Sequence, residues 1–133
     1  MFVTPLYAGL LVLWFVVLSV RVVNLRRGGI LFGDNGDVAV IRIVRAHANF
    51  AEYVPLALLL MGFLEVSRFS IYILHALGLT LFISRLVHGL ALSFGWQVRF
   101  GRVAGAALTF VVLLIEAVLC LYQGFRGQWL WWQ

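Results

Sequence analysis

Long apolar stretches, interrupted by few charged residues, make up most of the chain. The first runs from Val3 to Val20 without a charged side chain, close to the roughly 20 residues that a helix needs to cross the hydrocarbon core of a bilayer. The sequence therefore predicts an all-α integral membrane protein, a single four-helix bundle that occupies residues 1–133. The expected spans cover about residues 3–25, 41–66, 69–93 and 103–123.

Composition supports a membrane protein. Hydrophobic residues make up 64% of the 133 residues, with a mean hydropathy of +1.05, whereas apolar residues are about half of a soluble domain. All ten basic residues are arginines, and the net charge is +5. On so apolar a chain this charge indicates membrane topology and anion binding, and it excludes a nucleic-acid platform, which needs a basic face on a soluble module. The single cysteine, Cys120, is interpreted as a packed or lipid-facing side chain.

The arginines are distributed unequally between the two membrane faces. Because cytoplasmic loops carry the excess of arginine, loops one and three are expected in the cytoplasm and both termini outside. The amino-terminal stretch lacks a positively charged leader and is interpreted as a retained first span. The tryptophan-rich tail, 128–133, is typical of an interfacial anchor. Arginines expected toward the cytoplasm are Arg21, Arg26, Arg27, Arg42, Arg45, Arg85, Arg99 and Arg102, against Arg68 and Arg126 on the other face.

The glycine-rich loop 28–37 carries no recognisable ligand site. It lacks the Lys-Ser/Thr pair of a phosphate cradle, and Arg45 stands where a calcium loop that began at Asp34 would need a glutamate. A turn at Asn35-Gly36 is the simpler interpretation.

Polar side chains interrupt the second and third spans. Arg45, Asn49 and Glu52 fall at i, i+4 and i+7, on one face of a helix. Ionisable groups at membrane depth are costly and usually face a bundle interior, where they pair or bind ligands. Arg85 lies at a depth similar to that of Glu52, so these two are expected to form an ion pair, with His88 on the same face as Arg85.

Such a set of arginines with one acid and one asparagine suits a small anionic ligand that carries carboxylates, an ammonium group and amides. Glutathione has this outline, and a nearby guanidinium would favour the thiolate form of its thiol. The histidines have too few carboxylate or thiolate companions for a metal site, so none is predicted.

The run Arg45-x-His47-x-Asn49-x-x-Glu52-Tyr53-x-Pro55, followed by Arg85-x-x-His88, resembles the MAPEG family, the membrane-associated proteins in eicosanoid and glutathione metabolism. The resemblance covers essentially the whole chain. It implies a homotrimer of four-helix subunits with glutathione bound between neighbouring subunits near the cytoplasmic face, used in transferase, peroxidase or isomerase chemistry.

The resemblance also assigns roles to residues. The family's thiol-activating arginine lies at the start of the fourth span, where Arg102 is the better match and Arg99 the second choice. Positions that match the glutathione-binding region of the family are Arg21, Arg45, His47, Asn49, Glu52, Tyr53, Arg85 and His88.

Two positions depart from the family members that synthesise eicosanoids. Leu92 stands where such enzymes have a tyrosine, and Ala48 replaces a basic residue. These differences favour a general or bacterial-type member, located in a bacterial inner membrane with its site facing the cytoplasm.

The resulting hypothesis is a trimeric enzyme that adds glutathione to a hydrophobic electrophile, or uses it to reduce a hydroperoxide, arriving from the lipid bilayer. One alternative is a transport or proton-relay component in which Glu52, Glu116 and the histidines carry charge. Another is an accessory subunit in which the polar network is only structural.

Overall fold

The computed structural model describes residues 2–30, 33 and 36–130. Over these residues the chain forms four helices: α1 (Thr4–Arg27), α2 (Val38–Val66), α3 (Ile71–Phe94) and α4 (Val98–Leu130). Each of them is long and apolar enough to cross a membrane, α4 over Val98–Arg126. The predicted all-α class with four membrane-spanning helices is confirmed.

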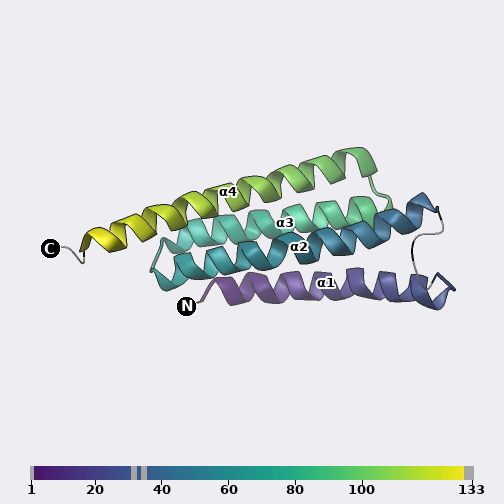
Figure 1. Cartoon of the computed structure of the whole chain (residues 1–133), viewed down its shortest axis with the longest axis horizontal. Helices are drawn as coiled ribbons and strands as arrows, with labels where there is room; N and C mark the ends of the chain where they lie inside the picture. The colour runs from purple at the N-terminus through teal and green to yellow at the C-terminus, as the bar shows by residue number, and fades with distance from the viewer. Residues whose placement is uncertain (1, 31–32, 34–35, 131–133) are drawn as a thin grey trace.

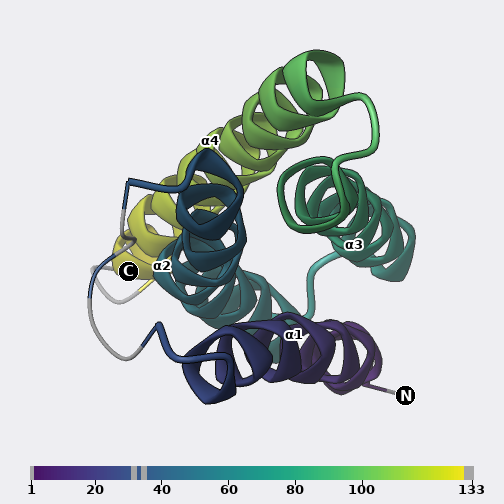
Figure 2. The ribbon, with the colours of Figure 1, turned by 90° about the vertical axis from the view of Figure 1, so that its right-hand side faces the viewer.

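The four helices run along the long axis of the molecule (Figure 1). The α1–α2 and α3–α4 connections lie at one end, and the α2–α3 turn lies at the other end with both termini. Figure 2 shows the bundle from the end that carries the α1–α2 and α3–α4 connections. Helices α1 and α4 each pack against both α2 and α3. Helices α2 and α3 therefore have neighbours on more sides than α1 and α4, and their side chains can be buried inside the bundle.

Helices α4 and α2 differ most from the expected boundaries, and α4 also continues past residue 123 to Leu130. Helix α4 begins at Val98, within the predicted connector, so Arg99 and Arg102 lie in its first turns. Helix α2 begins at Val38, where the Asp37 side chain accepts a hydrogen bond of 2.7 Å from the Ala39 N–H. The predicted Asn35-Gly36 turn includes a residue outside the described ones, and the predicted tryptophan anchor lies beyond the last described side chain.

Close packing of α3 against α4 depends on Gly105. A Cβ atom at this position would lie 2.6 Å from the Cβ of His88 and 2.7 Å from the Ser84 carbonyl oxygen. One turn further along α4, the Thr109 hydroxyl lies 3.0 Å from the Ser84 hydroxyl. Small residues permit such close approach, which is a main source of helix association in membranes.

We expect Gly105→Ala to lower the free energy of unfolding by about 1–3 kcal/mol, because the added methyl group must push α4 away from a backbone carbonyl. Gly62→Ala is the matched control, since a Cβ at Gly62 has no atom within 4 Å. Thermal unfolding in detergent measures both changes. An equal response of the two variants would contradict the close α3–α4 contact.

Candidate functional site

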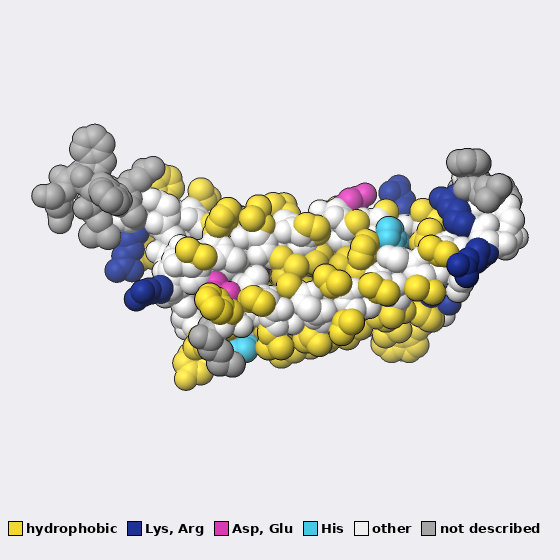
Figure 3. Space-filling view, turned by 90° about the horizontal axis from the view of Figure 1, so that it is seen from below, with side chains coloured by type: hydrophobic (Ala, Val, Ile, Leu, Met, Phe, Trp, Pro, Cys, Tyr) yellow, Lys and Arg dark blue, Asp and Glu magenta, His cyan; other side chains and the backbone are white. Residues whose placement is uncertain are grey.

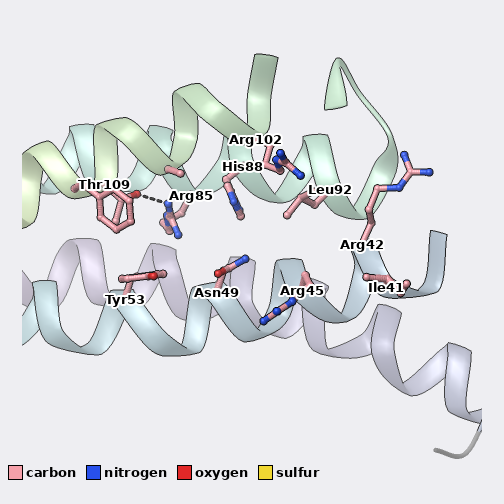
Figure 4. A pocket seen from close by; sticks show the side chains of 12 residues that line it. Ile41, Arg42, Arg45, Asn49, Tyr53, Arg85, His88, Leu92, Arg102 and Thr109 are labelled. Carbon is pink, nitrogen blue, oxygen red and sulfur yellow. Dashed lines mark hydrogen bonds between the residues drawn. The ribbon is translucent and has the colours of Figure 1, made fainter. Parts of the chain in front are cut away.

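A cavity of about 400 Å³ lies between α2, α3 and α4, toward the end that carries the α3–α4 connection (Figure 4). It is bounded by polar side chains along most of its length and by a few apolar ones. The polar lining consists of Arg42, Arg45, Asn49, Tyr53, Arg85, His88, Arg102 and Thr109, and the apolar lining of Ile41, Leu92, Ala106 and Phe110.

Helix α2 supplies one wall of the cavity. Arg45, Asn49 and Tyr53 follow one another at intervals of four residues, which places them along one face of the helix. The Tyr53 ring meets the Phe110 ring of α4 edge-on, with 5.4 Å between ring centroids. This contact closes one end of the wall and fixes which face of α2 is turned to the cavity.

Helix α3 supplies the opposite wall, where Asn49 and Tyr53 face His88 and Arg85 (Figure 4). The Arg85 side chain is only 2% exposed. Its guanidinium donates a 2.9 Å hydrogen bond to the Gly105 carbonyl oxygen and another hydrogen bond to the Thr109 hydroxyl. A buried cation is thus held by neutral acceptors of α4, and its Nε has no hydrogen-bond partner among the described residues.

The predicted ion pair between Glu52 and Arg85 is wrong within this chain. Glu52 is exposed and does not line the cavity. Consecutive residues of a helix point about 100° apart, so when Tyr53 turns toward α4, its neighbour Glu52 turns outward from the bundle. Of the face that the spacing defined, Arg45 and Asn49 line the cavity and Glu52 does not.

Sequence reasoning missed the groups that hold Arg85, namely the Gly105 carbonyl and the Thr109 hydroxyl. A signal for them is present in the sequence. Small residues stand at 101, 105 and 109 of α4, the four-residue spacing that brings two membrane helices close enough for a side chain of one to reach the backbone of the other.

The structure distinguishes between the two arginines that were candidates for activating the thiol of glutathione. Arg102 lines the cavity, opposite Arg45. Arg99 is exposed and is not among the lining residues. The geometry therefore favours Arg102 over Arg99.

Arg21 lies beside a second, smaller cavity of about 250 Å³, to which Arg42 also contributes. Its guanidinium donates a 2.5 Å hydrogen bond to the Ser93 carbonyl oxygen and lies 4.2 Å from the centre of the Phe94 ring. Because Arg42 lines both cavities, the two spaces are neighbours. Arg21 belongs to the smaller one.

His47 does not reach the main cavity. Its ring stacks on Phe15 of α1, with 4.7 Å between ring centroids. Two residues along a helix correspond to about 200° of rotation, so His47 and Arg45 point to opposite sides of α2. The structure thus brings together six of the predicted site residues, Arg45, Asn49, Tyr53, Arg85, His88 and Arg102, and places Arg21, His47, Glu52 and Arg99 elsewhere.

Comparison with known proteins assigns the family. The sequence profile of the MAPEG family matches residues 4–122. The chain belongs to the MAPEG family. It is 32% identical over 123 residues to the inner membrane protein YecN of Escherichia coli strain K12, a match that covers 90% of this chain and 91% of that protein. YecN of Escherichia coli O6:H1 strain CFT073 matches equally. No solved structure matches this chain.

The MAPEG chain is a multi-pass membrane protein, with four apolar helices. Neither His75 nor Glu116 lines the main cavity. His75 lies 3.2 Å from the Tyr7 hydroxyl, far along the bundle from His88. Glu116 is fully buried, and neither of its carboxyl oxygens has a hydrogen-bond partner among the described residues. The described residues contain no cluster of three or more metal-ligating side chains.

Replacing Glu116 by leucine should raise the free energy of unfolding of this MAPEG protein by about 1–3 kcal/mol, because a buried polar group without partners is costly. Glu65→Leu is the control, and it should lower the free energy of unfolding. The Glu65 carboxylate accepts hydrogen bonds from the N–H groups of Val3 and Thr4 at the start of α1. Thermal unfolding in detergent compares the two; destabilisation by Glu116→Leu would reveal a partner for the carboxyl group.

Proposed function

We propose that this MAPEG protein is a glutathione-dependent membrane enzyme that conjugates hydrophobic electrophiles or reduces hydroperoxides. The observation that carries the proposal is the cavity between α2, α3 and α4, which is lined by four arginines and, among the described residues, by no carboxylate. Such a site selects a small molecule with more than one negative group. The chain belongs to the MAPEG family, and the resemblance to that family implies a role in glutathione metabolism.

The cavity suits glutathione in size and in chemistry. Its volume of about 400 Å³ falls within the roughly 300–1,000 Å³ of small-molecule pockets. Two carboxylates match the guanidinium groups, since arginine binds carboxylates through paired hydrogen bonds. Asn49 and Tyr53 offer an amide and a hydroxyl for the peptide groups.

Each residue has a distinct role in the proposed chemistry. Glutathione, when bound, supplies a thiol nucleophile. The thiol proton passes to water, and Arg102 stabilises the thiolate that remains, because its guanidinium stays charged. Arg45 and Arg85 hold carboxylates, and the neutral acceptors around Arg85 leave its charge available to a ligand. Leu92 and Phe110 exclude water from the apolar side, where the second substrate enters from the membrane.

A homotrimer, also part of the proposal, would account for the predicted site residues that face away from the cavity. Glu52 is exposed on a membrane-spanning helix, where an unpaired carboxylate facing lipid costs about 2.5–3.5 kcal/mol on insertion scales. A neighbouring copy packed on this face of α2 would cover the carboxylate. It would also bring Glu52 toward the ammonium group of the ligand.

The proposed location is an inner membrane, with both termini outside and the cavity open to the cytoplasm. Arginines concentrate at the end of the bundle that holds the α1–α2 and α3–α4 connections, as the distribution of positive charge predicts. The cytoplasm is also a compartment in which glutathione is kept reduced.

Turnover of glutathione by the purified protein tests the proposed function. Proteoliposomes receive glutathione with chlorodinitrobenzene in one assay and with cumene hydroperoxide in another. We expect saturation with glutathione and a rate well above that of empty liposomes. Arg27→Gln is the control, since Arg27 is exposed and lines neither cavity. A rate equal to that of empty liposomes in both assays would reject transferase and peroxidase activity.

A further inference from the structure

A third cavity, also polar, lies at the opposite end of the bundle from the two described above. It has a volume of about 720 Å³ and lies between the end of α2 and α4. Ser67, Arg68, Gln123 and Arg126 supply its polar lining, and the described residues contribute no carboxylate to it. Figure 3 shows basic side chains at both ends of the molecule, with a largely apolar surface between them.

An apolar groove adjoins this cavity on the outer side of the bundle. The groove has a volume of about 500 Å³, and side chains of α2 and α4 line it, among them Leu60, Ala117 and Leu121. Cys120 and Gly124 line both the groove and the polar cavity. The polar cavity and the apolar groove are therefore continuous with each other.

Both arginines of the cavity lie at the same membrane boundary. Arg68 lies two residues beyond Val66, the last residue of α2, and Arg126 lies in the last turns of α4, which ends at Leu130. Long cationic side chains at the ends of spans extend to the level of the lipid headgroups. Since the groove runs from this level toward the middle of the bundle, its direction is that of a lipid acyl chain.

The turn after α2 places an arginine where the backbone would favour a glycine. Arg68 has a φ of 56°, in the left-handed region, and its N–H donates a 3.0 Å hydrogen bond to the Glu65 carbonyl oxygen. Residues other than glycine and asparagine are uncommon in this conformation. The backbone geometry of the turn therefore does not explain the arginine, whereas an anion held by its side chain would.

We propose that the polar cavity and the groove together bind one anionic phospholipid. Its phosphate lies between Arg68 and Arg126, with Ser67 and Gln123 as further hydrogen-bond donors, and one acyl chain lies along Leu60 and Leu121. The absence of a carboxylate from the cavity lining disfavours the ammonium group of a zwitterionic headgroup. The groove distinguishes a lipid from a free phosphate, which would use only the polar end.

Native mass spectrometry of the full-length protein in detergent tests this site. Phosphatidylglycerol and phosphatidylcholine are titrated in parallel. We expect one phosphatidylglycerol per chain to bind in preference to phosphatidylcholine. The double variant Arg68→Gln, Arg126→Gln should weaken the binding at least about tenfold, the loss typical of one charge-assisted hydrogen bond. Leu121→Trp, which fills the groove but keeps both arginines, should also weaken it.

The charge-matched control is the double variant Arg27→Gln, Arg99→Gln, because both side chains are exposed at the other end of the bundle and line neither this cavity nor the groove. It should bind phosphatidylglycerol as the wild type does. Equal binding of the two lipids, or equal weakening by the two double variants, would overturn the proposal. So would displacement of phosphatidylglycerol by millimolar inorganic phosphate together with normal binding to Leu121→Trp, because a free anion would then be the ligand.

Discussion

Replacing Arg102 by alanine should lower kcat/KM for glutathione conjugation about 100- to 1,000-fold, the usual loss when one preorganised charge is removed from a reacting centre. Arg102 lines the main cavity, and its charge stabilises the thiolate that reacts. The ultraviolet absorbance of the thiolate should appear when glutathione binds the wild type and disappear in the variant. Affinity for glutathione should change less than kcat, because other arginines hold the carboxylates.

Arg99→Ala provides the comparison, since Arg99 lies in the same first turns of α4 but outside the cavity lining. We expect its thiolate absorbance and rate to remain within about threefold of the wild type, in line with a change of about 0.5 kcal/mol at an exposed position. If the thiolate absorbance survives in Arg102→Ala and vanishes in Arg99→Ala, then Arg99 stabilises the thiolate and Arg102 does not.

Replacing Arg85 by methionine should stabilise the protein without ligand by about 1–3 kcal/mol and abolish most of its affinity for glutathione. A buried cation without an acidic partner is costly, and an apolar side chain of similar length often stabilises such a position. The groups that it leaves remain paired: the Thr109 hydroxyl keeps its 2.8 Å hydrogen bond to the Gly105 carbonyl oxygen and its contact with Ser84. Stability and binding should therefore change in opposite directions.

Thermal unfolding in detergent, with and without glutathione, measures both effects in one experiment. The wild type should gain stability from glutathione, because a ligand that binds only the folded state stabilises it, and Arg85→Met should not. If Arg85→Met unfolds at a lower temperature than the wild type without ligand, the guanidinium serves packing rather than binding. Arg85→Lys keeps the charge but loses the paired geometry, so an intermediate affinity is expected.

Hydropathy and spacing predict much of this molecule. The helices follow from the apolar stretches, since a bilayer requires spans of known length whose backbone groups are paired internally. Arg45 and Asn49 share a face because of their four-residue interval, and both line the cavity; Tyr53 was named only through the family resemblance. These features depend on one helix at a time, which is why the sequence alone predicts them.

Features that depend on how two helices meet were less predictable. The partner of Arg85 was expected to be an acid at equal depth, but rotation of α2 about its axis turns Glu52 outward. Rotation is set by packing, for which the sequence carries only the weak signal of small residues in α4. The meeting of Arg68 and Arg126 in one cavity likewise depends on the path of the turn after α2, where the left-handed residue is an arginine.

Equilibrium binding of glutathione to the detergent-solubilised protein, measured by titration calorimetry, tests most directly whether the arginine-lined cavity is a glutathione site. We expect saturable binding to the wild type and to Arg27→Ala, and at least about tenfold weaker binding to Arg45→Ala, in which one charge-assisted contact is missing. Wild-type protein without saturable binding, or an Arg45→Ala variant that binds as tightly as the wild type, would contradict it.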